Sequence, residues 1–167
     1  MDEKKHSLWE KFFKPDLDSR FWLRLIILAA AAYILFGHVL RPCLIWGESM
    51  EPTYGSFGIT FCLLDDEAGE KADYGDIVVI RYHTRTLYLK RLIGKPGDRI
   101  RFIGGKLYRN GEAVDEPYVS YPCDWDLPEE TVDEGMLYVV GDNRSMDWRK
   151  HRMGQVDRDR IIGHPIW

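Results

Sequence analysis

Two short segments contain the residue types from which a serine peptidase site could be built. In the first, residues 47–53 (GESMEPT), Ser49 follows a glycine that permits close backbone approach and precedes a proline that fixes the chain. A serine held on such a loop can present its hydroxyl together with its own backbone N–H, and acyl transfer requires both groups at one carbonyl. Taken alone, a serine between glycine and proline is more often a simple turn residue.

The second segment places a lysine inside an apolar strand. In residues 87–93 (LYLKRLI), period-two alternation puts Tyr88, Lys90 and Leu92 on one face. Burial among apolar side chains lowers the pKa of a lysine, because desolvation disfavours the ammonium, and a neutral amine can serve as a general base. A lysine in such a strand is otherwise a snorkelling or ion-paired side chain.

Other site chemistries find less support. No motif surrounds any of the five histidines, so a Ser-His-Asp triad is not indicated; they are His6, His38, His83, His151 and His164. The spacing of Cys43, Cys62 and Cys123 matches no zinc pattern, and HExxH does not occur, so we expect no metal and no cofactor. In an oxidising compartment one disulfide could form, with Cys62–Cys123 favoured over the other pairings, and free buried thiols are at least as well supported.

One segment has the length and composition of a membrane anchor. The run LIILAAAAYILFGHVL from residue 25 to residue 40, with its aromatic flanks, is about a bilayer in length when helical. Six Lys and Arg precede residue 25, which favours a cytoplasmic N-terminus. We therefore expect a cytoplasmic basic tail at 1–20, a transmembrane helix at 21–41 ended by Pro42, and an exported domain at 42–167 of a single-pass inner-membrane protein. The alternatives are a cleaved signal peptide and a buried core helix.

The exported body is acidic and rich in strand signals. From residue 42 onward it has 16 Lys and Arg against 22 Asp and Glu, a formal net charge of −6, which excludes nucleic acid as a partner. Apolar, β-branched and aromatic runs separated by Gly, Pro, Asn and Asp predict strands at 43–46, 58–64, 76–82, 86–93, 99–103, 105–108, 112–114, 136–140 and 160–163. Asn110-Gly111 predicts a hairpin, residues 95–98 (KPGD) a turn, and residues 118–135 a surface loop. The predicted fold is a mostly β, antiparallel domain on one N-terminal membrane helix.

The two segments, in this order after a membrane helix, resemble the bacterial type I signal peptidases (leader peptidases), a family of serine–lysine peptidases. The serine box resembles GESMEPT at 47–53, and the lysine box resembles YLKRLIGKPGDRI at 88–100. A third box, GDNR at 141–144 followed by Ser145, Asp147 and Arg149, resembles the family's GDN signature. The likeness covers most of residues 42–167.

The resemblance implies roles for individual residues. Ser49 would be the nucleophile, Lys90 the general base, and the Ser49 N–H one oxyanion donor. Ser145 would orient the lysine amine, although it stands two residues closer to GDNR than in many members. The resemblance adds Asp142, Asp147 and Arg149 as supports of the site through turns and ion pairs, and it gives the shallow pockets for small substrate side chains to Ile45, Met50 and Leu89. Gly47 stands where some members have a serine that donates a second hydrogen bond to the oxyanion.

The function implied is endopeptidase cleavage of N-terminal signal peptides from exported preproteins. The substrate, an Ala-x-Ala signal peptide, would bind as an added strand at the outer face of the lipid bilayer, and we expect a monomer. One alternative is a specialised processing peptidase, for example for pilin subunits. Another is an inactive, membrane-anchored binding module, against which the intact Ser49 and Lys90 argue.

Overall fold

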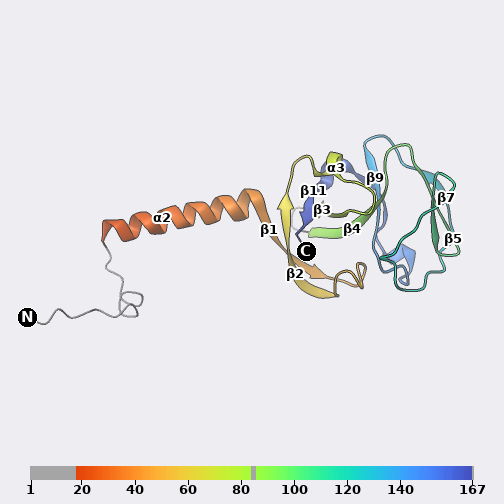
Figure 1. Cartoon of the computed structure of the whole chain (residues 1–167), viewed down its shortest axis with the longest axis horizontal. Coiled ribbons are helices and arrows are strands. Elements are labelled where there is room, and N and C mark those ends of the chain that lie inside the picture. The colour runs from red at the N-terminus through yellow and green to blue at the C-terminus, as the bar shows by residue number, and fades with distance from the viewer. Residues whose placement is uncertain (1–17, 84–85, 167) are drawn as a thin grey trace, which may run out of the picture. The chain divides into compact units, whose positions relative to one another are not determined.

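The computed structural model describes residues 18–83 and 86–166. The chain divides between Val39 and Leu40 into two units, which are described here one at a time. The first unit contains the apolar helix, and the second contains the β domain (Figure 1).

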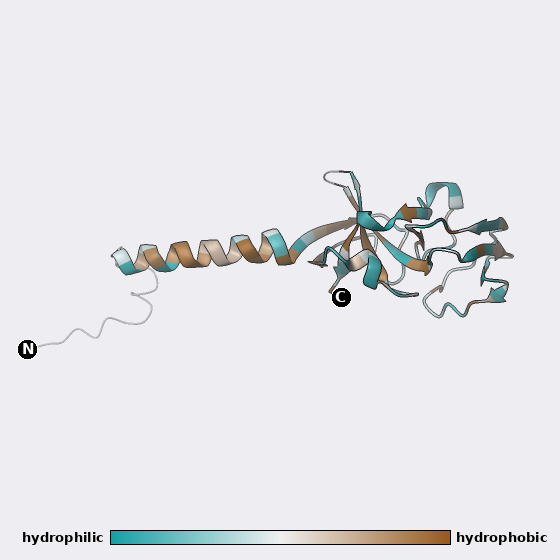
Figure 2. Cartoon of the chain, turned by 90° about the horizontal axis from the view of Figure 1, so that it is seen from above, coloured by the Kyte–Doolittle hydropathy of each residue, from teal (hydrophilic) through white to brown (hydrophobic). Residues whose placement is uncertain are grey.

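The helix of the first unit is predominantly apolar. It runs as α2 from Ser19 to Ile34 and continues as a π-helical turn, η1, from Leu35 to Val39. Asp18 caps it, accepting a hydrogen bond from the Phe21 N–H at 2.8 Å. Its 21 residues have a mean hydropathy of 1.8, and none of them is buried. The brown stretches of its ribbon in Figure 2 are the hydrophobic residues. By length and composition this helix can cross a membrane.

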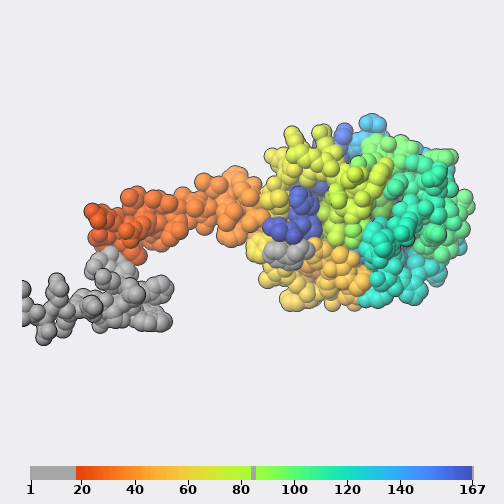
Figure 3. Space-filling view, viewed as in Figure 1, coloured from red at the N-terminus to blue at the C-terminus, as the bar shows by residue number. Residues whose placement is uncertain are grey.

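The first sheet of the β domain contains seven strands, and all its neighbouring pairs are antiparallel. In spatial order they are β1 (Leu40–Trp46), β2 (Phe57–Leu64), β11 (Ile161–Pro165), β3 (Ile77–His83), β4 (Thr86–Gly94), β9 (Met136–Val140) and β10 (Gly154–Asp157). The last strand thus returns to the middle of the sheet. In Figure 3 these C-terminal residues, in blue, lie between the yellow and lime-green segments.

The second sheet has four antiparallel strands, in the order β7 (Glu112–Ala113), β6 (Lys106–Arg109), β5 (Arg99–Ile103) and β8 (Leu127–Thr131). In Figure 1 it lies on the far side of β9 from β1 and β2. An apolar cluster that includes Ile93, Phe102, Trp125 and Val140 joins the two sheets. The short helices are α3 (Ala68–Lys71), η2 (Trp148–Lys150) and η3 (Arg158–Arg160).

The mostly β, antiparallel fold is confirmed, and so are both turns. Asn110 and Gly111 have φ angles of 57° and 87° and join β6 to β7, as a two-residue hairpin requires. The 95–98 turn closes with a 3.0 Å hydrogen bond from the Asp98 N–H to the Lys95 carbonyl. The prediction of a loop throughout 118–135 is wrong, because β8 lies inside it. Four of the five β8 residues are exposed, so no apolar alternation marked the strand.

The end of the membrane-type helix also differs from expectation. The helical span is 19–39 rather than 21–41, and Arg41 and Pro42 belong to β1. A proline has no N–H to donate, and β1 tolerates one because it is the edge strand of its sheet, paired only with β2. One side of β1 therefore has no strand beside it within the described residues.

Part of β4 also lacks a neighbouring strand on one side. Its neighbour β9 pairs with it only from Arg91 onward, at Arg91, Leu92 and Gly94. Residues 86–90 of β4 therefore pair with β3 on one side and have no described strand on the other. Lys90 is the last residue of this open half.

Candidate active site

The loop after β1 positions Ser49. Gly47 has a φ of 133°, a backbone conformation that residues with a Cβ rarely adopt, and its N–H donates to the Ser56 carbonyl at 2.9 Å. That bond closes the loop on the start of β2. Ser49 is half-buried within it, two residues after Gly47.

Lys90 lies beside this serine. Its side chain comes from the middle of β4, opposite Val78 of β3, and only 2% of the residue is exposed. The distance from Lys90 Nζ to Ser49 Oγ is 2.8 Å. Burial lowers the pKa of the Lys90 amine from 10.5 to about 8; nearby Arg152 lowers it further and Asp142 opposes the shift. The two residues that the sequence singled out are in hydrogen-bond contact, and the lysine is easily deprotonated.

The loop after β9 holds the serine loop from the other side. The Asn143 N–H donates to the Ser49 carbonyl at 3.0 Å, and its side-chain amide donates to the Glu48 carbonyl at 3.0 Å. Gly141 packs so closely that a Cβ there would collide with the Ser49 carbonyl and the His151 ring. The glycine and the asparagine of the GDN box thus fix the backbone on which Ser49 is carried.

A buried ion pair anchors the same loop to β4. Asp142 is fully buried and accepts from Arg91 Nε at 2.7 Å and Arg91 Nη2 at 2.5 Å, a two-pronged contact. The Thr53 hydroxyl donates to the same carboxylate at 2.5 Å. Because Arg91 follows Lys90 directly, this pair also fixes the part of β4 that carries the amine.

We expect Asp142→Asn to destabilise the domain strongly, because it leaves the buried Arg91 guanidinium without its counter-charge. The expected cost is about 3 kcal/mol in the free energy of unfolding, which corresponds to a fall of roughly 10 °C in Tm. Thermal unfolding of the full chain in detergent measures it. The matched control is Asp147→Asn. Asp147 pairs with Arg149 on the exposed surface at 3.9 Å, so this substitution should change Tm by less than about 2 °C. Equal effects of the two changes would contradict this role of Asp142.

His151 is a functional residue that the sequence reasoning missed. It is 1% exposed, its Nδ1 accepts from the Gly141 N–H at 3.3 Å, and its Nε2 lies 2.9 Å from the Asn143 carbonyl. Because a carbonyl can only accept, Nε2 carries the hydrogen and the ring is neutral. Burial first, and nearby Lys90 second, lower the pKa of His151 to about 4. The ring spans the GDN loop and adds no positive charge beside the lysine.

A second buried arginine ties the site to the rest of the domain. Arg144 is fully buried and donates to the Gly141 carbonyl at 2.8 Å and to Glu116 at 2.6 and 3.0 Å. Glu116 follows the β6–β7 hairpin in the second sheet. The GDN loop is therefore held from both sheets.

The structure places the remaining expected supports elsewhere. Ser145 is exposed and its hydroxyl donates to Asn143 Oδ1 at 2.6 Å, so its partner is not Lys90 but the side chain that holds the Glu48 carbonyl. Asp147 caps η2 through the Arg149 N–H, and both side chains are exposed. The loop is too short after GDNR to bring Ser145 back to β4, and Asp142, Asn143 and His151 fix the site instead.

The expected pocket residues lie around one cavity of about 590 Å³ that includes Ser49. Ile45 from β1, Met50 from the serine loop and Leu89 from β4 all line it. The cavity lies between residues of β1 and residues 86–89 of β4, the two strands with open sides. A serine hydroxyl within hydrogen-bond distance of a buried lysine amine therefore lies at an apolar cleft.

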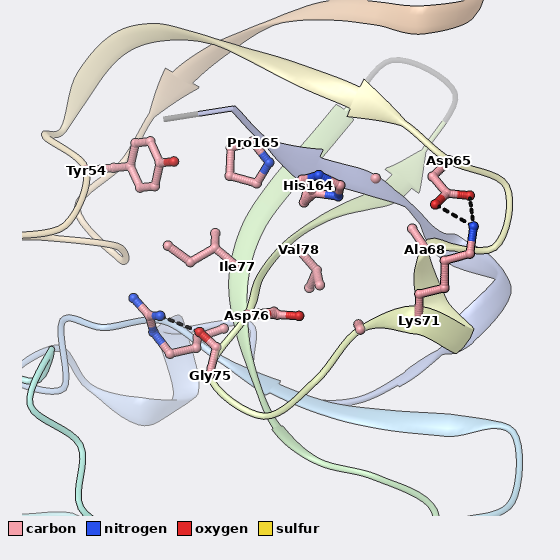
Figure 4. A pocket seen from close by; sticks show the side chains of 13 residues that line it. Tyr54, Asp65, Ala68, Lys71, Gly75, Asp76, Ile77, Val78, His164 and Pro165 are labelled. Atoms are coloured by element: carbon pink, nitrogen blue, oxygen red, sulfur yellow. Dashed lines mark hydrogen bonds and ion pairs between the residues drawn. The ribbon is translucent and has the colours of Figure 1, made fainter.

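Another cavity, of about 540 Å³, is lined by a different set of residues (Figure 4). Its lining includes Tyr54, Ile77, Val78 and His164, and its lysine, Lys71, pairs with Asp65 at 3.0 Å. Lys71 is exposed, and its contacts with Glu67 first and Asp65 second raise its pKa, so it is no base. This cavity contains neither member of the Ser49–Lys90 pair.

The three cysteines are unpaired, which is one of the two outcomes left open by the sequence. Cys43 and Cys62 are buried in one apolar cluster of the first sheet, whereas Cys123 packs against the cluster that joins the two sheets. All three are free thiols, so the favoured Cys62–Cys123 disulfide is absent. Among the described residues, no group of three or more His, Cys, Asp or Glu is placed to hold a metal ion.

The sequence pattern of one protein family, described as "Signal peptidase, peptidase S26", matches residues 19–167. The chain belongs to this signal peptidase family. As a family member it is a serine endopeptidase, and its family supports cleavage of signal peptides as its activity.

Curated relatives of this signal peptidase match it over most of its length. Signal peptidase I T of Bacillus subtilis (strain 168) is 34% identical, covering 98% of this chain and 92% of the relative. Signal peptidase I of Bacillus licheniformis is 33% identical, covering 96% and 87%. Signal peptidase IB of Staphylococcus aureus is 31% identical, covering 83% and 84%. A crystal structure of a signal peptidase I from Enterococcus faecalis is 26% identical with a TM-score of 0.46, covering 56% of this chain and 96% of that one.

Proposed function

We propose that this signal peptidase is a membrane-anchored enzyme in which Ser49 is the nucleophile and Lys90 the general base. The observation that carries the proposal is the 2.8 Å separation of Lys90 Nζ and Ser49 Oγ, with the lysine 2% exposed. A buried amine with a pKa of about 8 is deprotonated in an appreciable fraction of molecules near neutral pH.

In the proposed reaction, the neutral Lys90 amine accepts the proton of the Ser49 hydroxyl as Oγ attacks the carbonyl carbon of the scissile bond. The resulting ammonium gives that proton to the leaving amine when the C–N bond breaks. The signal peptide is then an ester of Ser49. Water attacks the ester, with Lys90 again accepting the proton, and hydrolysis restores the free serine and the amine.

The tetrahedral intermediate needs hydrogen-bond donors for its oxyanion. The Ser49 N–H makes none of the hydrogen bonds seen among the described residues, so it is free to donate. The contacts from Asn143 to the Glu48 and Ser49 carbonyls hold the peptide group that contains this N–H and the peptide group that follows it. A donor whose backbone is fixed in advance stabilises the oxyanion without reorganisation.

The substrate is proposed to bind as an extended strand between β1 and the open half of β4. Both strands offer unpaired backbone groups on the sides that have no described neighbour, as strand addition requires. Ile45, Met50 and Leu89 would leave room only for small side chains beside Ser49, in line with an Ala-x-Ala signal.

A substrate panel tests this specificity. The purified full chain should cut a generic preprotein once, directly after Ala-x-Ala, as read by N-terminal sequencing of the product. Alanine-to-phenylalanine at the last signal residue should lower kcat/KM by at least about 100-fold, because the ring does not fit, while alanine-to-serine at that residue should be tolerated. Failure to cut generic preproteins, together with cleavage of pilin precursors alone, would favour the specialised peptidase.

We further propose that the apolar helix at 19–39 anchors the enzyme, with the residues before it in the cytoplasm and the β domain, from Leu40 onward, outside. The apolar helix at 19–39 and the six Lys and Arg before residue 25 support this orientation.

Protease added outside sealed spheroplasts should digest the β domain and spare an epitope fused before residue 1. Permeabilised spheroplasts provide the control, because both parts should then be digested. A β domain that survives outside protease but not permeabilisation would reverse the orientation.

A further inference from the structure

A basic hollow lies on the β domain apart from the catalytic cavity. We use this name for the open surface of about 590 Å³ lined by Arg41, Arg81, Tyr82, His83 and Arg160. The residues come from β1, β3 and η3, and none of the described lining residues is acidic. Three arginines therefore line one depression.

The arginines of the basic hollow are not neutralised by the described part of the chain. Arg160 donates from Nε to the Arg81 carbonyl at 3.0 Å and from Nη2 to the Tyr82 carbonyl at 2.8 Å, and its guanidinium lies 5.2 Å from the Tyr82 ring centre. These contacts fix the direction of Arg160 and leave its positive charge uncompensated. Neither Arg41 nor Arg81 has an ion pair with any described residue. One arginine whose planar fork is held in place, beside two arginines without a carboxylate partner, suits a phosphate group.

The chain itself keeps one residue of the basic hollow near the end of the apolar helix. Arg41 is two residues after Val39, the last residue of the apolar span. Two residues reach at most about 7 Å, so the Arg41 backbone stays close to the end of the span in any arrangement of the two units. This is the depth at which lipid phosphates lie.

We propose that the basic hollow binds the phosphate of an anionic phospholipid headgroup at the membrane surface, with Arg41, Arg81 and Arg160 as its ligands. The inference rests on the proposed membrane anchor and adds a lipid site to it. From residue 42 onward the chain has a formal net charge of −6, so an anionic bilayer repels the domain as a whole. One basic site beside the helix exit gives the domain a single favourable contact and thereby sets which face it turns to the bilayer.

Lipid titration of the full chain in a neutral detergent tests the site without relying on catalysis. Short-chain phosphatidylglycerol should bind at least tenfold more tightly than the matching phosphatidylcholine, and the binding should weaken with added salt. In Arg81→Gln/Arg160→Gln the dissociation constant for phosphatidylglycerol should rise about 25-fold, or about fivefold for each arginine near a lipid surface. Arg81→Gln alone changes an exposed side chain and should raise the dissociation constant for phosphatidylglycerol about fivefold. This single variant keeps the test valid if the double variant misfolds.

The matched control is Arg101→Gln/Lys106→Gln, which removes the same charge from exposed positions in β5 and β6 and should leave lipid binding unchanged. Inorganic phosphate and glycerophosphoglycerol, the headgroup without its chains, should bind at least tenfold more weakly than the lipid. Equal binding of the free headgroup, equal binding of the two lipids, or unchanged affinity in Arg81→Gln would each overturn the lipid site. Cleavage of a soluble peptide in the same detergent should be equal in wild type and variants, so loss of the proposed catalytic function would be seen separately.

Discussion

Replacing Lys90 with alanine should lower kcat for preprotein cleavage by at least about 1000-fold, because it removes the base that activates Ser49. The 2.8 Å contact between Nζ and Oγ is the only hydrogen bond shown for the Lys90 amine among the described residues, so its loss should act on the nucleophile itself. Lys90→Arg should fail equally, since a guanidinium stays protonated at any usable pH.

Lys95→Ala is the matched control for Lys90→Ala. Lys95 follows β4 by one residue, is paired with Asp73 at 3.0 Å, and lies outside the catalytic cavity, so its loss should change kcat less than twofold. Circular dichroism of each variant checks the fold. Near-normal turnover in a folded Lys90→Ala enzyme would remove lysine from the mechanism.

The rate should depend steeply on pH below 8. Only the neutral amine can accept the serine proton, and its pKa is about 8, so kcat/KM should rise tenfold per pH unit and level off above pH 8. At pH 6 about 1% of the plateau should remain. Arg152→Gln should move the midpoint upward, because Arg152 helps to lower the Lys90 pKa.

The matched control for that shift is Arg149→Gln, which removes an exposed arginine that pairs with Asp147, and its midpoint should stay in place. Initial rates with a signal-peptide substrate, measured from pH 5 to pH 10, give both midpoints. A profile that is flat below pH 8, with chemistry limiting the rate, would contradict an amine base.

The same pKa shift affects stability, with a definite sign. Between pH 8 and 10.5 the folded lysine has lost its proton while the unfolded one retains it, so the free energy of unfolding rises with pH in this window. Below pH 8 the buried ammonium costs the fold about 3 kcal/mol. A buried lysine is therefore maintained here at a cost in stability, which supports its proposed role as the general base.

Local sequence patterns predicted the two central residues. Ser49 was marked by its glycine and proline neighbours, and Lys90 by a charge within an apolar strand, because both signals lie within seven residues of chain. The turn at Asn110-Gly111 was equally local. Each of these features is determined by short-range backbone preferences or by period-two alternation.

The residues that hold the site could not be found in this way, since their partners lie far apart in the chain. Asp142 meets Arg91 across 51 positions, and the Asn143 side chain meets Glu48 across 95. One signal was available and unused: Lys90 and Arg91 are adjacent cations in one apolar strand, so alternation directs them to opposite faces and each needs a reason for burial. His151 had no such mark, because only the folded GDN loop shows what its ring nitrogens contact.

The role of Ser49 as nucleophile is tested most directly with a preprotein that carries an Ala-x-Ala signal. The preprotein is incubated with equal amounts of the wild-type full chain or of Ser49→Ala, and the N-termini of the products are sequenced over time. The wild-type enzyme should make one cut, directly after the final alanine. Ser49→Ala should give no product above the uncatalysed background, although that variant should fold and melt like the wild type. Cleavage at the same bond by Ser49→Ala at a rate near that of the wild type would show that Ser49 is not the nucleophile.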